Sequence, residues 1–99
     1  MKKILILPFS ISNSIPDKNY LEEGILEELI DLSSEVKNYT CSSRSISLYL
    51  NDHPTIGKIL KEEFGIDFII EGSLKVKNGE YLLSGRLVDA VENEVIKVF

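Results

Sequence analysis

Residues 65–90 read GIDFIIEGSLKVKNGEYLLSGRLVDA and contain the strongest structural signal in the chain. Asn78-Gly79 separates two runs of strand-forming residues. This dipeptide is typical of a type I′ hairpin turn, because that turn needs positive φ at both central positions. A two-residue loop pairs Lys77 with Glu80 and so fixes the register of both strands. A slip of one residue would exchange their faces, so the alternation of apolar and polar residues favours this register alone.

The register predicts what each face of the hairpin carries. Glu71 faces Arg86, an opposite-charge pair that contributes about 0.2–1 kcal/mol on an open sheet face. Gly72 faces Gly85 and leaves a notch without side chains across both strands; such strand glycines mark a close approach of packed groups. The notch shares its apolar face with Leu74, Val76, Tyr81, Leu83 and Leu87, and the polar face carries Ser73, Lys75, Lys77, Glu80, Ser84 and Arg86. We therefore expect Leu83 to be buried and a helix side chain such as Leu29 or Phe64 to cover the notch.

The remaining elements follow from hydrophobic periodicity. We expect strands at 4–7, 36–41 and 94–99, helices at 18–34 and 54–64, and hairpin strands from 68 to 77 and from 80 to 89. Asp17 is the expected N-cap of the first helix and Gly65 the left-handed residue that ends the second. Gly24 lies inside the first helix at a cost of about 1 kcal/mol relative to alanine, so a close packing contact is expected there. Residues 41–52 are expected to be irregular.

The predicted order of elements is β-α-β-α-β-β-β. Right-handed crossovers place the second and third strands on opposite sides of the first and the two helices on opposite faces. The fold class is therefore α/β, a single mixed five-stranded sheet of order 2-1-3-4-5 with strand 4 antiparallel and two flanking helices. Ninety-nine residues predict one domain, 1–99.

Charge and hydropathy exclude several classes of partner. The net charge of −5 argues against nucleic acid or an anionic membrane as the main partner, since both are bound through clustered Lys and Arg. No stretch approaches the roughly 18–20 apolar residues of a membrane span, so direct membrane insertion is not expected. The start MKKILILPF is too short for the apolar core of a signal peptide and lacks a cleavage site. The chain as it stands is expected to be cytoplasmic, or periplasmic if it belongs to a membrane-anchored parent protein.

No catalytic or metal-binding constellation is present in the pattern. Cys41 is the single cysteine and is interpreted as a small buried residue near a strand end, and His53 has no second histidine or cysteine with which to share a metal. Glu23, Glu27 and Asp31 recur every four residues on the first helix, which is typical of a solvated helix face. We expect neither enzymatic activity nor a cofactor.

A small-ligand site is the alternative function that the residues leave open. In open α/β sheets, ligands bind beyond the carboxyl ends of the parallel strands, where the strand order reverses. The candidate anion ligands near that edge are Ser10, Ser42, Ser43, Arg44 and Ser73. Serine-rich loops are also common as simple turns, so the competing interpretation is structural.

Five segments in order give the chain a family resemblance. They are LPF (7–9), YLEEGILEEL (20–29), SRS (43–45), IGKILKEEFGIDFIIEGSL (56–74) and GRLVDAVENEV (85–95). The chain resembles the TolB amino-terminal-like domain family, which occurs beside tetratricopeptide repeats, in bacterial adenylate cyclases and in membrane-bound winged-helix regulators. The resemblance implies a mixed sheet with flanking helices and a non-catalytic regulatory or protein-interaction module of a bacterial signalling or cell-envelope protein. Asn93 stands where the family commonly has glycine, and asparagine also tolerates positive φ.

The last strand is the expected contact with a partner. Val95, Ile96, Val98 and Phe99 are apolar, and only Lys97 guards what should be a sheet edge. The family usually continues past this strand, whereas this sequence stops at Phe99, as a domain excised from a longer protein would. We expect the edge to receive a strand from a protein partner, or from a second copy in a symmetric antiparallel dimer. The alternative is that a natural continuation covers the edge and that the chain is monomeric.

Overall fold

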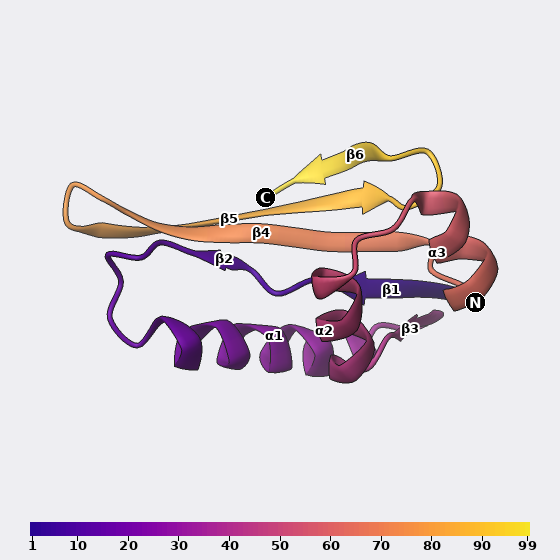
Figure 1. The fold of residues 1–99 in the computed structure, drawn as a ribbon, viewed down its shortest axis with the longest axis horizontal. Coiled ribbons are helices and arrows are strands. Elements are labelled where there is room, and N and C mark those ends of the chain that lie inside the picture. The colour runs from indigo at the N-terminus through magenta and orange to yellow at the C-terminus, as the bar shows by residue number, and fades with distance from the viewer.

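The computed structural model describes all residues from 1 to 99, in a body with extents of 42 × 28 × 23 Å. Two strands precede the first helix and two helices follow the third strand, after which a long hairpin and a last strand complete the sheet (Figure 1). The strands are β1 (Lys2–Ile6), β2 (Ser10–Ile11), β3 (Tyr39–Cys41), β4 (Phe68–Lys77), β5 (Glu80–Asp89) and β6 (Glu94–Val98). The helices are α1 (Lys18–Ser34), α2 (Arg44–Asp52) and α3 (Gly57–Phe64). None of these three helices is both long enough and apolar enough to cross a bilayer.

The sheet has the predicted topology. Its order is β3-β1-β4-β5-β6, with β3 and β4 parallel to β1, and with β5 antiparallel to both β4 and β6. This order confirms the predicted 2-1-3-4-5 arrangement. The short β2, which falls in a stretch expected to be a loop, adds to the sheet by pairing Ser10 with Ser73 of β4.

The hairpin has the predicted register. Lys77 pairs with Glu80, and the ladder runs without a break back to Phe68 and Asp89. Asn78 and Gly79 have φ of 51° and 76°, as a type I′ turn requires. The expected ion pair is also formed, because Arg86 Nη2 lies 2.9 Å from Glu71 Oε1.

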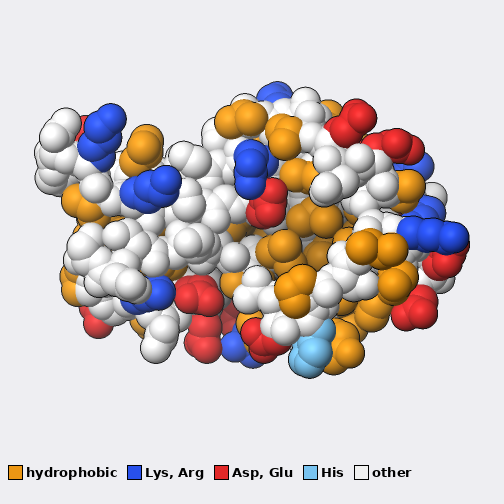
Figure 2. Space-filling model, turned by 45° about the horizontal axis from the view of Figure 1, so that its top comes forward, with side chains coloured by type: hydrophobic (Ala, Val, Ile, Leu, Met, Phe, Trp, Pro, Cys, Tyr) orange, Lys and Arg blue, Asp and Glu red, His pale blue; other side chains and the backbone are white.

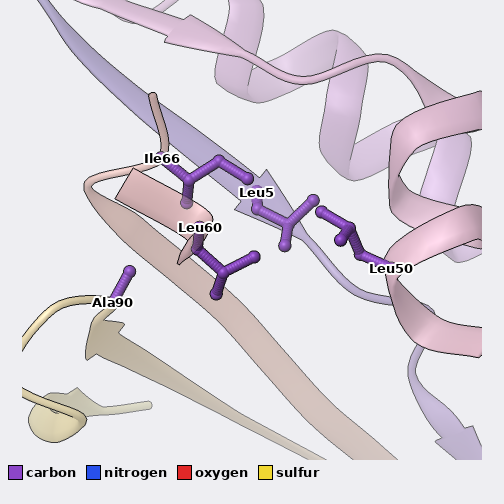
Figure 3. Close-up of a cluster of buried hydrophobic side chains, with 5 residues drawn as sticks. All are labelled: Leu5, Leu50, Leu60, Ile66 and Ala90. Atoms are coloured by element: carbon purple, nitrogen blue, oxygen red, sulfur yellow. The ribbon is translucent and has the colours of Figure 1, made fainter. Parts of the chain in front are cut away.

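The core has two parts, one on each face of the sheet. On one face, Ile4 and Ile6 of β1 pack against Leu26 of α1. On the other face, Leu5 packs with Leu50 of α2, Leu60 of α3, Ile66 and Ala90, and Figure 3 shows these five side chains converging. Successive side chains of β1 thus point into opposite parts of the core, as expected for a strand buried on both sides.

Helix α2 was not predicted. It occupies 44–52, within a stretch expected to be irregular. Its N-cap is Ser43, whose Oγ accepts a hydrogen bond of 3.4 Å from the Ile46 backbone N–H. Its apolar stripe is narrow and interrupted by serines, one of which, Ser47, is fully buried. The remaining predicted elements differ only at their ends: β1 starts at Lys2, β3 covers only 39–41, α3 starts at Gly57, and β6 ends at Val98.

Of two predicted details of α1, the position of the N-cap is confirmed and the packing contact of Gly24 is wrong. Asp17 is at the N-cap position, but it has φ of 58° and its side chain makes no capping hydrogen bond, because a left-handed backbone replaces the extended one that capping requires. Gly24 makes no close packing contact, since nothing lies within 4 Å of where its Cβ would be. By contrast, Gly65 ends α3 in the predicted left-handed conformation, with φ of 69°.

Two phenylalanine rings, rather than Leu29 or Phe64, cover the glycine notch. A Cβ on Gly72 would lie 2.4 Å from the Phe9 ring, and one on Gly85 would lie 2.5 Å from the Phe99 ring. The notch is therefore a packing device, as predicted, but its covering side chains come from the loop after β1 and from the residue after β6. Helix α1 instead packs chiefly against β1, β2 and β3.

The outer half of the hairpin extends beyond the helices (Figure 1). Leu83 is 58% exposed and Tyr81 is 65% exposed, so the predicted burial of Leu83 is wrong although its register is right. A strand pattern reveals which residues share a face, but it does not reveal whether another element is long enough to cover that face.

Candidate interaction surface

The predicted anion ligands fall into two groups. Ser10 and Ser73 are direct cross-strand partners between β2 and β4. They line a polar cleft of about 560 Å³ on the hairpin face that carries the Glu71–Arg86 ion pair. Three other polar residues that the ligand prediction missed also line this cleft, namely Asn51, Lys75 and Ser84. The alternation along β4 and β5 had placed Lys75 and Ser84 on this polar face, whereas no pattern pointed to Asn51.

The other group lies after β3 and already has partners within the chain. Ser42 is buried, and Ser43 caps α2. The Arg44 guanidinium reaches two carboxylates of α1, with Nη2 at 3.3 Å from Glu23 Oε1 and Nε at 3.6 Å from Glu27 Oε1. These contacts neutralise part of the positive charge that an anion would need.

The acidic row of α1 is exposed, and the single cysteine, Cys41, is half-buried. Glu23, Glu27 and Asp31 are exposed, as a solvated helix face requires. No group of three or more His, Cys, Asp or Glu side chains is placed to hold a metal ion. Burial raises the pKa of the Cys41 thiol, which lowers its thiolate fraction and its reactivity.

Asp67 is a largely buried carboxylate whose contacts connect β1 with α3. Its Oδ2 accepts a hydrogen bond of 2.9 Å from the Lys3 backbone N–H, and its Oδ1 pairs with Lys61 Nζ of α3. The hydrogen bond from Lys61 and then that from the Lys3 N–H hold the pKa of Asp67 below its ordinary value of 3.8. The Asp67 side chain is only 10% exposed and joins β1 to α3, which is a structural role.

The free edge of the sheet is the most prominent surface that remains. β6 is the last strand in the order, pairs only with β5, and all its residues are exposed. Lys97 pairs with Leu87 and Val95 with Val88, so Ile96 between them has no partner of its own and forms a bulge. Beyond the bulge, Phe99 exchanges two backbone hydrogen bonds with Gly85, at 2.8 and 2.9 Å.

Figure 2 shows hydrophobic side chains gathered around a hollow in the half that contains α2 and α3, whereas the hairpin end carries separate Lys and Arg side chains.

Comparison with known proteins identifies the fold. No family model matches the chain. A Rhizobium meliloti protein named as an adenylate cyclase is 28% identical over 87 residues, which are 87% of this chain but only 15% of that protein. The chain thus spans a small part of its curated relative.

Three solved structures have the same architecture. Lipoprotein GNA1162 from Neisseria meningitidis matches with a TM-score of 0.70 and 19% identity, covering 100% of this chain and 77% of that one. The LpoB C-terminal domain from Escherichia coli matches with a TM-score of 0.65 and 13% identity, covering 99% and 78%. TolB from Acinetobacter baumannii matches with a TM-score of 0.58 and 18% identity, covering 99% and 22%. The chain has a TolB-like fold.

Proposed function

We propose that this chain is a non-catalytic protein-interaction module of a bacterial signalling or cell-envelope protein, and that its partner adds a strand to the β6 edge. The observation that carries the proposal is the uncovered edge itself. Natural proteins normally cover a sheet edge or protect it with charges. Here Val98 is 67% exposed and Phe99 is 60% exposed, and Lys97 is the only charged residue between Glu94 and the end of the chain.

The bulge at Ile96 favours one part of β6 as the place where the proposed partner strand would pair. A bulge interrupts the regular row of backbone groups and increases the local twist. The stretch before it is therefore a poor template, whereas Lys97 to Phe99 is regular. In the same direction lies the outer edge of β5 from Glu80 to Ser84, which β6 does not reach. A strand paired to the outer edge of β6 lies one strand position further from β5, so it pairs with Lys97 to Phe99 and does not reach these five residues.

The comparisons support this class of function. The curated relative is far longer than this chain, which is consistent with a small module attached to a separate output domain. One protein with the same fold is a lipoprotein by name, in keeping with a role in the cell envelope. Membership in the TolB amino-terminal-like family, with its signalling associations, is part of the proposal.

Sedimentation velocity over a range of concentrations tests self-association through the edge. If the partner is a second copy, the wild type should dimerise and Val98→Lys should stay monomeric. Val91→Lys is the matched control, because Val91 is 49% exposed but lies in the turn before β6. If the wild type is monomeric throughout, the partner strand must come from another protein. Pull-down with the neighbours of the parent protein, compared between wild type and Val98→Lys, then decides the question. Equal capture by both proteins would refute an edge interface.

The polar cleft favours a second candidate, a sensor of small anions. Ser10 and Ser73 meet there, and Lys75 makes no ion pair within the chain. Thermal-shift measurements against nucleotides and carboxylates test this function. A saturable shift that is lost in Lys75→Ala would support the cleft, and one lost in Arg44→Ala would support the site after β3. The absence of any shift would remove this candidate.

A further inference from the structure

A glycine in the middle of α1 has no explanation within the chain. Gly24 is six residues from the start of a 17-residue helix, where glycine is destabilising relative to alanine. Such a residue is retained where another backbone or a large side chain must approach closely. No such neighbour is present, since nothing lies within 4 Å of a Cβ built at this position. Alanine would therefore fit in the free protein.

The missing side chain leaves a hollow in the surface. A depression of about 590 Å³ lies over Gly24 and is bounded by its helical neighbours Tyr20, Leu21 and Glu28, with Leu83 of β5 on the far side. In helix–helix packing a side chain of one helix inserts among four residues of the facing helix, and the missing side chain at Gly24 leaves additional room for such an insertion. The hollow therefore has the form of a receptor for one large side chain of a second helix.

Exposed apolar residues extend this hollow toward the hairpin. Tyr20 is 79% exposed, and Tyr81 and Leu83, which share the notch face of β5, are also largely exposed. On β1 and the first half of β4 this same face is covered by α1. A helix laid beside α1 would cover the bare part in the same way, and contiguous apolar surface of this kind marks interaction sites.

The charges around the hollow specify the partner. Three carboxylates line it, and Arg44 neutralises only Glu23 and Glu27, in part, while Glu28 has no ion-pair partner. A second copy would bring another acidic α1 and a further net charge of −5 to the same place. We propose that this hollow binds an amphipathic helix of another protein segment, which inserts a large apolar side chain over Gly24 and places Lys or Arg beside Glu28. This helix site does not depend on the proposed strand partner at β6.

The test uses two synthetic 18-residue helical peptides with the same leucine and phenylalanine stripe. One carries lysine beside the stripe and the other glutamate. Each is titrated into the ¹⁵N-labelled full chain, and the amide signals of Gly24, Tyr20 and Leu83 are followed. We expect saturable shifts with the lysine peptide, and an affinity at least about tenfold lower with the glutamate peptide, as expected for several like-charge contacts.

Variants separate the hollow from general surface effects. Gly24→Leu fills the hollow and should abolish the shifts, while its helical signal and unfolding midpoint are retained or raised. Glu28→Lys should lower the affinity for the lysine peptide about fivefold, as expected for the loss of one exposed ion pair. Glu62→Lys on α3 is the matched control and should leave the affinity unchanged, because Glu62 is exposed and lies outside the hollow.

Several results would overturn the proposal. These are the absence of saturable shifts, shifts centred elsewhere, or equal affinities for wild type and Gly24→Leu. If the same amide signals shift with protein concentration in the absence of peptide, the occupant of the hollow is a second copy of this chain and not a basic helix. Because Val98→Lys changes only the β6 edge, retention of peptide binding in that variant distinguishes failure of the strand proposal from failure of this one.

Discussion

The glycine notch yields the sharpest prediction about stability, which concerns Gly72→Ala. A Cβ at this position would lie 2.2 Å from the Ser84 carbonyl oxygen and 2.4 and 2.7 Å from two carbons of the Phe9 ring. Ordinary contacts of a Cβ begin near 3.4 Å. The Ser84 oxygen belongs to the β4–β5 ladder, and Phe9 is only 3% exposed and packed with Ile11 and Ile15. Neither group can move without breaking other contacts.

The expected loss follows from two opposing effects. Overpacking of a filled site costs about 1–3 kcal/mol. Replacing glycine restricts the unfolded chain and offsets about 0.4–1 kcal/mol of that cost. We therefore expect Gly72→Ala to lower the free energy of unfolding by about 1–2 kcal/mol. The directly opposite Gly85→Ala should cost less than Gly72→Ala, because its Cβ would meet only the Phe99 ring, which is 60% exposed and can move aside.

Urea unfolding followed by circular dichroism measures both variants. With a slope m of about 1 kcal/mol/M, Gly72→Ala should lower the midpoint by about 1–2 M without changing m. Phe9→Leu in the Gly72→Ala background should recover part of the loss, so that the double-mutant cycle shows a favourable coupling of about 1 kcal/mol. Equal midpoints for Gly72→Ala and Gly85→Ala would refute the idea that the two rings constrain the notch differently.

Three further predictions concern ionisable groups. The lowered pKa of Asp67 means that its ionised form adds stability above the ordinary value of 3.8, and that this stability is lost as the pH falls through the lower folded-state value. The difference in free energy of unfolding between wild type and Asp67→Ala should therefore narrow from pH 5 to pH 2 in urea titrations; a constant difference would contradict the assignment. Cys41 should react with iodoacetamide more slowly in the native protein than in urea, as its raised pKa implies; equal rates would contradict this. Arg86→Ala should reduce stability by less than about 1 kcal/mol in thermal unfolding, because its ion pair with Glu71 is exposed.

The hairpin shows how much of the fold could be predicted from the sequence. Asn78-Gly79 set the turn, and ten cross-strand pairs followed from it without error. Topology followed as well, because right-handed crossovers with helices on opposite faces place the second and third strands on opposite sides of the first. These features depend on local chemistry and on chirality, both of which a single sequence contains.

The errors have a common physical origin in contacts between distant residues. α2 was missed because its helix depends on the Ser43 cap and on Leu50 packing into a core that only the folded chain assembles. The rings over the notch come from Phe9 in the loop after β1 and from Phe99 after the last strand, and no local pattern reveals what either side chain covers. Within the candidate anion site, the serines on β2 and β4 met as the topology required. Arg44 instead paired with carboxylates of α1, because no local pattern specifies the direction that α1 takes after the loop at 12–17.

Two of these errors concern residues for which a packed neighbour was predicted and is absent. An error in predicting burial can indicate strain, or it can indicate that a contact lies outside the chain. Leu83 has the predicted register and the predicted face, yet it is exposed, and Gly24 has the predicted helix but not the predicted neighbour. Both residues border the same hollow. Two separate inferences from the sequence, one from a strand and one from a helix, each required a packed neighbour that the chain does not supply. The simplest physical account of both is one neighbouring helix from a partner, and Gly24→Leu tests it directly because that variant removes the space without disturbing the fold.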